Sequence, residues 1–212
     1  MNLRLVVAAV IPEPSPEWLT QCYHGPKWCA VFEIHDERQN VQIIGQTYKE
    51  KLTAFFAVEP RDASAVDKVI SSFASPYMVS CIVLFTIGDI AYIISKRGGK
   101  AFLKRHESFA VLTKGDGTIG GKSQVSDMFI LTSKTTTDRF PDQSLLAMVD
   151  HLPLEDVAAE IMVKLHAIPD STGCGAAVIR VEKSDEVSAE SLMTDAQSRS
   201  LKKILTNSSL VW

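Results

Sequence analysis

Short runs of apolar residues, separated by turn signals, occupy much of the chain. Residues 28–34, 41–45 and 52–58 are rich in β-branched and aromatic residues, and the polar stretches between them are short enough for hairpins. We therefore expect three successive strands there, after a first strand at residues 3–11. The period changes at residues 62–74, where apolar side chains recur at helical spacing behind an acidic first-turn residue, which predicts a core-facing helix.

The second half of the chain continues with strands and then alternates them with helices. Turn signals separate three consecutive strand candidates, an arrangement typical of an antiparallel meander. The later segments have either strand composition or a helical repeat of apolar positions. We expect strands at 77–86, 90–95, 100–104, 127–132 and 175–182, and helices at 142–150, 154–166 and 189–205.

A glycine-rich segment at residues 113–122 is predicted to be a loop. It runs into Gly120-Gly121-Lys122-Ser123, which has some likeness to a phosphate-binding loop. Such a loop needs a helix directly after it, whereas residues 124–131 have the composition of a strand. Nucleotide binding is therefore not expected at this segment.

Composition and charge describe one ordinary globular domain. The 212 residues are 46% hydrophobic and 22% charged, with a formal net charge of −3. Lys and Arg are scattered without a basic stripe, so nucleic-acid binding is not expected. No segment approaches the roughly 20 apolar residues of a membrane span. Residues 1–183 are expected to form the domain, and residues 184–212 a C-terminal helical extension or tail that packs on it or binds a partner.

The four cysteines have no CxxC spacing, which favours a reducing, cytoplasmic location. Cys22, His24 and Cys29 could supply three zinc ligands, but no fourth ligand is in sight. Buried thiols are the simpler interpretation of these residues.

Four segments follow one another in an order typical of one enzyme family. They are Phe55-Phe56-Ala57-Val58-Glu59-Pro60-Arg61, Arg97-Gly98-Gly99-Lys100-Ala101-Phe102-Leu103, residues 127–135 with Thr132-Ser133-Lys134 near their end, and Asp170-Ser171-Thr172-Gly173-Cys174. They resemble the signatures Val-x-Asp-Gly, Gly-Asp-Ser-Arg-Ala-Tyr-Leu, Ser-Asp-Gly and Asp-Asn-x-Thr of the metal-dependent Ser/Thr protein phosphatases of the 2C type, the PPM family. The family's early Asn-Glu-Asp element is at best residues 48–51.

The resemblance covers roughly residues 28–182 and implies an α+β fold. That fold is a four-layer αββα sandwich, in which two antiparallel sheets are flanked by helices on both outer faces. The number of strands and helices expected from the sequence permits this architecture.

The resemblance also implies that metal ligands have been lost. Pro60 and Lys134 stand where the family has metal-binding aspartates, and Gly98 replaces the carboxylate of the second signature. Hydrolysis of a phosphate ester by two metal ions needs several carboxylates that converge on the ions. An ammonium group in their place repels the cations. Weak residual metal candidates are Glu50, Glu59, Asp62 and Asp170.

The sequence therefore predicts a pseudophosphatase, with no catalytic residues, cofactor or metal, that acts as a protein-binding or regulatory module. Lys134 is either a solvated loop residue or part of a vestigial cleft for a phosphorylated peptide or another anion. The alternatives are an active phosphatase that uses Mn²⁺ or Mg²⁺ at a divergent site, and an unrelated α+β enzyme. The five histidines occur in no catalytic motif, so other catalytic layouts have no support.

Overall fold

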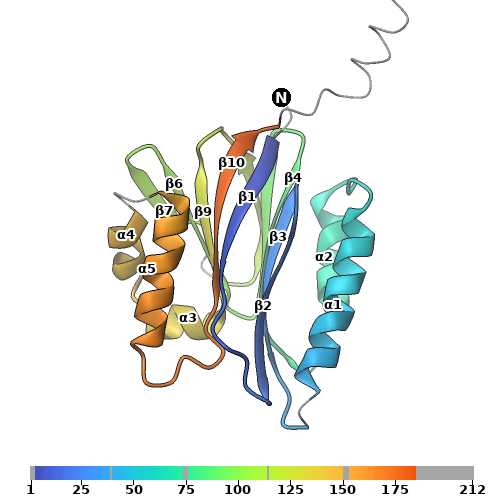
Figure 1. Cartoon of the computed structure of the whole chain (residues 1–212). Helices are drawn as coiled ribbons and strands as arrows, with labels where there is room; N and C mark the ends of the chain where they lie inside the picture. The colour runs from blue at the N-terminus through green and yellow to red at the C-terminus, as the bar shows by residue number, and fades with distance from the viewer. Residues whose placement is uncertain (1–2, 39, 74–75, 114, 150–152, 185–212) are drawn as a thin grey trace, which may run out of the picture. The chain divides into compact units, whose positions relative to one another are not determined.

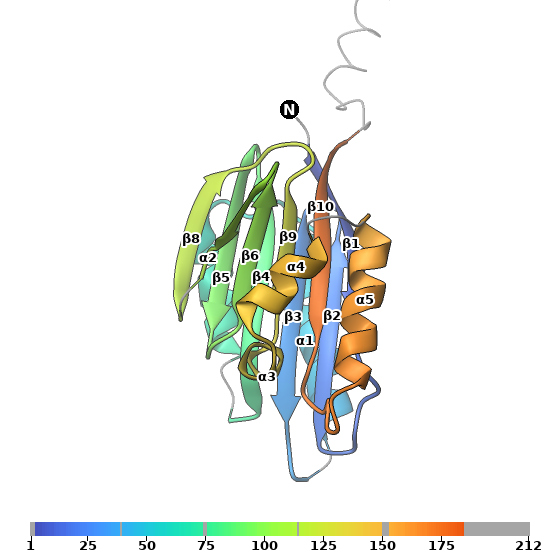
Figure 2. The same ribbon diagram turned by 90° about the vertical axis from the view of Figure 1, so that its left-hand side faces the viewer.

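Two five-stranded antiparallel sheets pack face to face in the computed structural model, and helices cover the outer face of each sheet (Figure 1). The structure describes residues 3–38, 40–73, 76–113, 115–149 and 153–184. The first sheet has the strand order β1-β10-β9-β6-β7 and the second β2-β3-β4-β5-β8. Helices α1 and α2 cover the second sheet, and α4 and α5 cover the first (Figures 1 and 2). The predicted αββα sandwich is confirmed.

Between them, the described residues form the following elements. The strands are β1 (Leu3–Val10), β2 (Trp18–Gly25), β3 (Trp28–His35), β4 (Met78–Ile87), β5 (Ile90–Lys96), β6 (Lys100–Arg105), β7 (Ser108–Val111), β8 (Gly117–Lys122), β9 (Met128–Thr132) and β10 (Ala176–Lys183). The helices are α1 (Val41–Phe56), α2 (Ala63–Ser72), α3 (Lys134–Arg139), α4 (Asp142–Val149) and α5 (Leu154–His166).

Strand β3 shows why its sequence is apolar on both faces. Successive side chains of a strand point to opposite faces of a sheet. Ala30 and Phe32 pack with the helices, whereas Cys29 and Val31 pack between the two sheets. Because β3 is buried on both sides, the one charged residue within its apolar run, Glu33, needs partners inside the protein.

The strands expected at residues 41–45 and 52–58 are wrong, because helix α1 spans most of that stretch. Val41, Gly45, Tyr48 and Leu52 are buried, and their spacing places them on one helical face. A larger residue than Gly45 would not fit at this position of the helix, because its Cβ would lie 2.5 Å from Leu19 Cδ2 on β2. Close packing on the sheet thus explains a residue that is unfavourable in a helix interior.

The loop expected at residues 113–122 is also wrong in part, since Gly117–Lys122 forms the edge strand β8. All six of its residues are exposed, so no pattern of buried positions marks it in the sequence. Strands β2 and β7 were not expected either. The helix expected at residues 189–205 lies outside the described residues.

Candidate functional site

The candidate site lies where the ends of β3, β4 and β9 meet the first turn of α3 and the loop before β10. Glu33 on β3 lies opposite Ser80 on β4, and its side chain faces the space between the sheets. Strand β9 ends at Thr132 and leads through Ser133 into α3. The loop at residues 170–175 closes the site, because a Cβ at Gly173 would lie 3.0 Å from Glu33 Oε1.

Glu33 is fully buried, and its carboxylate accepts three hydrogen bonds from the protein. Ser80 Oγ donates to Oε2 at 2.9 Å, the Thr135 backbone N–H donates to Oε2 at 3.2 Å, and Thr135 Oγ1 donates to Oε1. Burial raises the pKa of Glu33, although these hydrogen bonds and the nearby Lys134 act in the opposite direction. The donors are hydroxyl and amide groups of the protein itself.

Lys134 begins helix α3 beside this carboxylate. Its backbone N–H donates to Ser80 Oγ at 2.9 Å, so Ser80 links it to Glu33. Its ammonium group pairs with Asp138 one turn further along the helix. Its aliphatic chain packs on Gly98, where a Cβ would lie 3.3 Å from Lys134 Cγ. The structure therefore brings together two of the predicted degenerate positions, Gly98 and Lys134.

Hydroxyl groups of the first turn of α3 fix the loop that closes the site. Ser133 Oγ accepts from the Thr136 N–H as the helix cap and donates to the Gly173 carbonyl at 2.9 Å. Thr136 Oγ1 accepts from the Gly175 N–H at 2.7 Å. Thr20 Oγ1 on β2 also donates to the Gly173 carbonyl, at 2.9 Å. The Thr-rich residues 133–137 are thus the beginning of a helix that connects the two sheets and the loop.

Asp170 lies in the same loop, at the exposed rim of the site. It accepts hydrogen bonds from the Thr172 N–H at 3.0 Å and from Arg139 at 3.1 Å. Hydrogen bonds from the Thr172 side chain, from the Thr172 backbone and from Arg139 lower the pKa of Asp170 to about 2. Among the residual metal candidates, Asp170 is the one in the loop whose Gly173 contacts Glu33, and it is already paired with Arg139.

Pro60 and the other residual candidates lie elsewhere. Because residues 52–56 belong to α1, Pro60 follows a helix rather than the strand that the resemblance implied. Glu59 pairs with Lys27, which directly precedes β3 and lies at the other end of this strand from Glu33. Asp62 caps α2 by accepting from the Ala65 N–H at 2.8 Å, and Glu50 accepts from Gln46 on α1.

Sequence reasoning missed Glu33, although a signal was present. Val31-Phe32-Glu33-Ile34 lies on a strand that precedes a helix, as the signature Val-x-Asp-Gly does, with glutamate in place of aspartate. The second signature can also be placed at another position than Gly98, which lies in the β5–β6 turn. The β4–β5 turn carries Gly88-Asp89-Ile90-Ala91-Tyr92, which shares more letters with the second signature but is shorter by one residue. Asp89 pairs with Lys122 and lies at the end of β4 far from Ser80.

The residues present do not fit a pair of Mn²⁺ or Mg²⁺ ions. Such ions take six or more oxygen ligands, and a two-metal centre needs several carboxylates between the ions. No group of three or more His, Cys, Asp or Glu side chains gathers in the part of the chain that the structure describes. Glu33 is already hydrogen-bonded by the protein, and Lys134 adds positive charge next to it.

Comparison with known proteins rests on structure, because no family model and no curated protein matches the sequence. The catalytic domain of the serine/threonine protein phosphatase PstP, solved with two manganese ions, has a TM-score of 0.71 at 13% identity over 86% of this chain and 100% of that one. PstP/Ppp of Mycobacterium tuberculosis has a TM-score of 0.65 at 12% identity over 85% and 98%. PppA of Pseudomonas aeruginosa, described as a key regulatory component of T6SS, has a TM-score of 0.63 at 10% identity over 85% and 99%. At identities this low the likeness shows the fold alone, and that fold is the 2C-type phosphatase fold.

Proposed function

We propose that this domain is a pseudophosphatase, a phosphatase-like fold without catalysis that acts as a protein-binding or regulatory module. The observation that carries the proposal is the state of Glu33. A carboxylate has about four lone-pair sites for hydrogen bonds or metal ions, and on Glu33 three of them accept hydrogen bonds from Ser80 and from two donors of Thr135. The protein thus supplies the positive partial charges that metal ions would supply in an active enzyme.

Lys134 supports the same conclusion through electrostatics. Its positive charge acts to lower the pKa of Glu33, so it is close enough to this carboxylate to oppose the binding of a cation there. The exposed ammonium group also pairs with Asp138, one turn further along α3. Without metal-activated water, the fold retains its surfaces and hydrogen-bonded loops but lacks the nucleophile for phosphate ester hydrolysis.

Titration with metal ions tests this proposal directly. We expect isothermal titration calorimetry with MnCl₂ and MgCl₂ to show no saturable binding in the micromolar range, and p-nitrophenyl phosphate with excess Mn²⁺ to show no turnover above the buffer rate. Glu33→Gln is the matched variant, because it removes the one buried carboxylate of the site. Turnover that disappears both on chelation with EDTA and in Glu33→Gln would overturn the proposal.

An active metal-dependent Ser/Thr phosphatase with a divergent site is the second candidate. It is favoured by the fold likeness to a phosphatase domain that holds two manganese ions and by the nearness of the Asp170 loop to Glu33. In that case the Glu33 carboxylate would exchange its bonds with Ser80 and Thr135 for bonds to an ion. Saturable Mn²⁺ binding that Glu33→Gln abolishes is the outcome that selects this candidate.

A further inference from the structure

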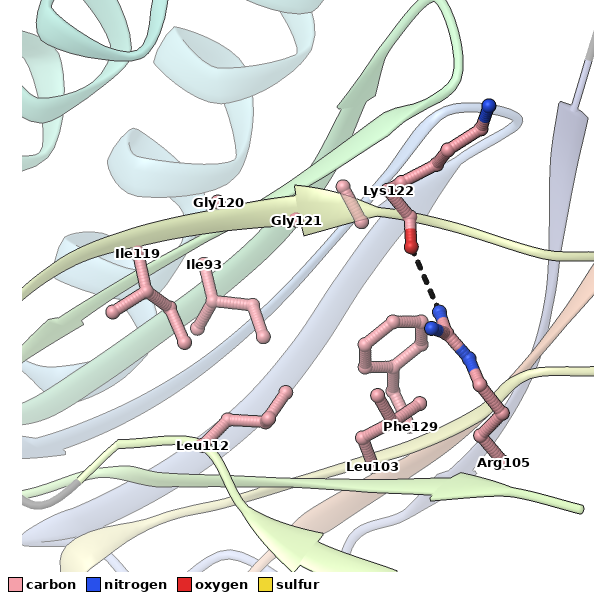
Figure 3. Close-up of a pocket in the computed structure, with 10 residues that line it drawn as sticks. Ile93, Leu103, Arg105, Leu112, Ile119, Gly120, Gly121, Lys122 and Phe129 are labelled. Atoms are coloured by element: carbon pink, nitrogen blue, oxygen red, sulfur yellow. Dashed lines mark hydrogen bonds between the residues drawn. The ribbon is translucent and has the colours of Figure 1, made fainter.

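A cavity of about 250 Å³ opens between the two sheets at the edge marked by β8, away from the site around Glu33 (Figure 3). Its walls are apolar and come from both sheets: β5 and β8 on one side, and β6, β9 and the segment after β7 on the other. The lining residues are Ala91, Ile93, Leu103, Arg105, Leu112, Ile119, Gly120, Gly121, Lys122 and Phe129.

A glycine in β8 keeps this cavity open. Ile119 and Gly121 lie two residues apart on the strand, so they face the same side of the sheet, and both line the cavity. A Cβ at Gly121 would meet no atom within 4 Å. The space in front of Gly121 could therefore hold a side chain, but the sequence supplies none.

Arg105 supplies the polar group at the mouth of the cavity. Its Nε and Nη2 bind the buried carboxylate of Asp127 at 2.8 and 2.7 Å, and Nη2 also donates to the Lys122 carbonyl at 2.7 Å. Among the described residues, no hydrogen bond uses Nη1. Because the guanidinium group is planar, Nη1 points away from Asp127, and in Figure 3 it lies on the side of Phe129. A fixed donor with free N–H groups thus lies beside an apolar space.

We propose that this cavity is a binding site for a small uncharged molecule with an apolar body of about bicyclic aromatic size and one hydrogen-bond acceptor. The size follows from comparison with an engineered apolar cavity of about 150 Å³, which binds benzene. The acceptor is matched to Arg105 Nη1. An uncharged ligand is favoured because Asp127 already neutralises the guanidinium group, so an anion gains little net attraction.

Quinoline and naphthalene test the proposal, because they share a shape and only quinoline carries an acceptor. We expect quinoline to shift the methyl resonances of Ile93, Leu103, Leu112 and Ile119 saturably in two-dimensional NMR of the whole chain at pH 7.5. Gly121→Leu should abolish binding of both probes by filling the cavity. Thr118→Leu is the matched control, because it adds the same side chain on the opposite face of β8, and it should bind like the wild type.

Arg105→Lys tests the role of the acceptor while keeping the positive charge beside Asp127. We expect it to weaken quinoline by about tenfold, the order expected for one hydrogen bond to a charged donor, and to leave naphthalene unchanged. Absence of saturable shifts, or unchanged binding in Gly121→Leu, would overturn the cavity as a site. Equal weakening of both probes in Arg105→Lys would overturn the pairing with Arg105. None of these outcomes depends on metal binding or turnover.

Discussion

The substitution Ser80→Ala tests whether Glu33 is held as an ionised, internally hydrogen-bonded carboxylate. Ser80 is buried, and its hydroxyl group donates to Glu33 Oε2 at 2.9 Å and accepts from the Lys134 N–H at 2.9 Å. Alanine removes both hydrogen bonds with little change in volume. The carboxylate then loses one of three donors, and the backbone N–H of Lys134 loses its acceptor.

The expected cost follows from the two hydrogen bonds that are lost. A hydrogen bond to a charged group contributes about 1.5–3 kcal/mol and a neutral one about 0.5–1.5 kcal/mol, so Ser80→Ala should lower the free energy of unfolding by about 2–4.5 kcal/mol. In the background of Glu33→Gln both bonds are neutral. The same substitution should then cost about 1–3 kcal/mol, and the difference is the coupling between Ser80 and the charge.

The sign of the pH dependence gives a second check. Burial raises the pKa of Glu33 in the folded protein, so the folded state binds this proton more tightly than the unfolded state does. Stability must therefore fall as pH rises from the unfolded pKa through the folded one. Removing a donor raises the folded pKa further, so Ser80→Ala should cost more at pH 8 than at pH 5.

Urea unfolding of the wild type, Ser80→Ala, Glu33→Gln and the double variant at pH 5 and pH 8 measures both the coupling and the pH dependence. Ser95→Ala is the control: Ser95 Oγ is equally buried but donates to the Gly99 carbonyl at 2.6 Å, so its cost of about 1 kcal/mol should not change with pH. A coupling below about 0.5 kcal/mol, the usual limit of additivity, would show that Ser80 does not interact with an ionised Glu33. So would a cost of Ser80→Ala that is the same at both pH values.

Three further substitutions have definite expected outcomes. Lys134→Asp places a second carboxylate beside Glu33 and should give saturable Mn²⁺ binding in calorimetry, whereas Lys134→Ala should give none. Absence of Mn²⁺ binding in both variants would mean that the charge at this position does not control metal binding. Gly98→Ala should cost about 1–3 kcal/mol in urea unfolding, because Gly98 has φ +92° and a Cβ would press on Lys134 Cγ; an unchanged midpoint would contradict this. Asp62→Ala should cost about 1 kcal/mol by loss of the α2 cap, while Asp62→Asn, which can also cap, should cost less.

The fold was largely predictable because most of its elements are buried on one face or two. The helices at residues 142–150 and 154–166 and the strands at 90–95 and 127–132 match the structure to within one or two residues. Helix α1 was missed because its β-branched and aromatic residues favour strands locally, while its packing on the sheet decides the outcome. Strand β8 was missed because a strand exposed along its whole length has no buried positions to reveal it.

The site was less predictable, since it depends on which segments meet in space. Lys134 was expected as a degenerate motif position and Asp170 as a residual metal candidate; the structure places Lys134 beside Glu33 and Asp170 in the loop whose Gly173 contacts Glu33. Ser80 and Thr135 could not have been found from spacing, because no motif distinguishes them from other hydroxyl residues of the chain. Their role appears only when β4 pairs with β3 and α3 begins at the end of β9.

The proposed inactivity has a different physical origin when the first signature is placed at Glu33 instead of Pro60. Pro60 offers no ligand to a metal ion, whereas Glu33 is a carboxylate on a strand that precedes a helix. Ser80 and Thr135 donate hydrogen bonds to this carboxylate, and Lys134 adds positive charge beside it. A buried carboxylate that is hydrogen-bonded in this way stabilises the fold only while its donors remain in place. A metal ion that binds Glu33 must therefore displace donors as well as find further ligands, and for that reason Lys134→Asp should bind Mn²⁺ more tightly when Ser80→Ala is added.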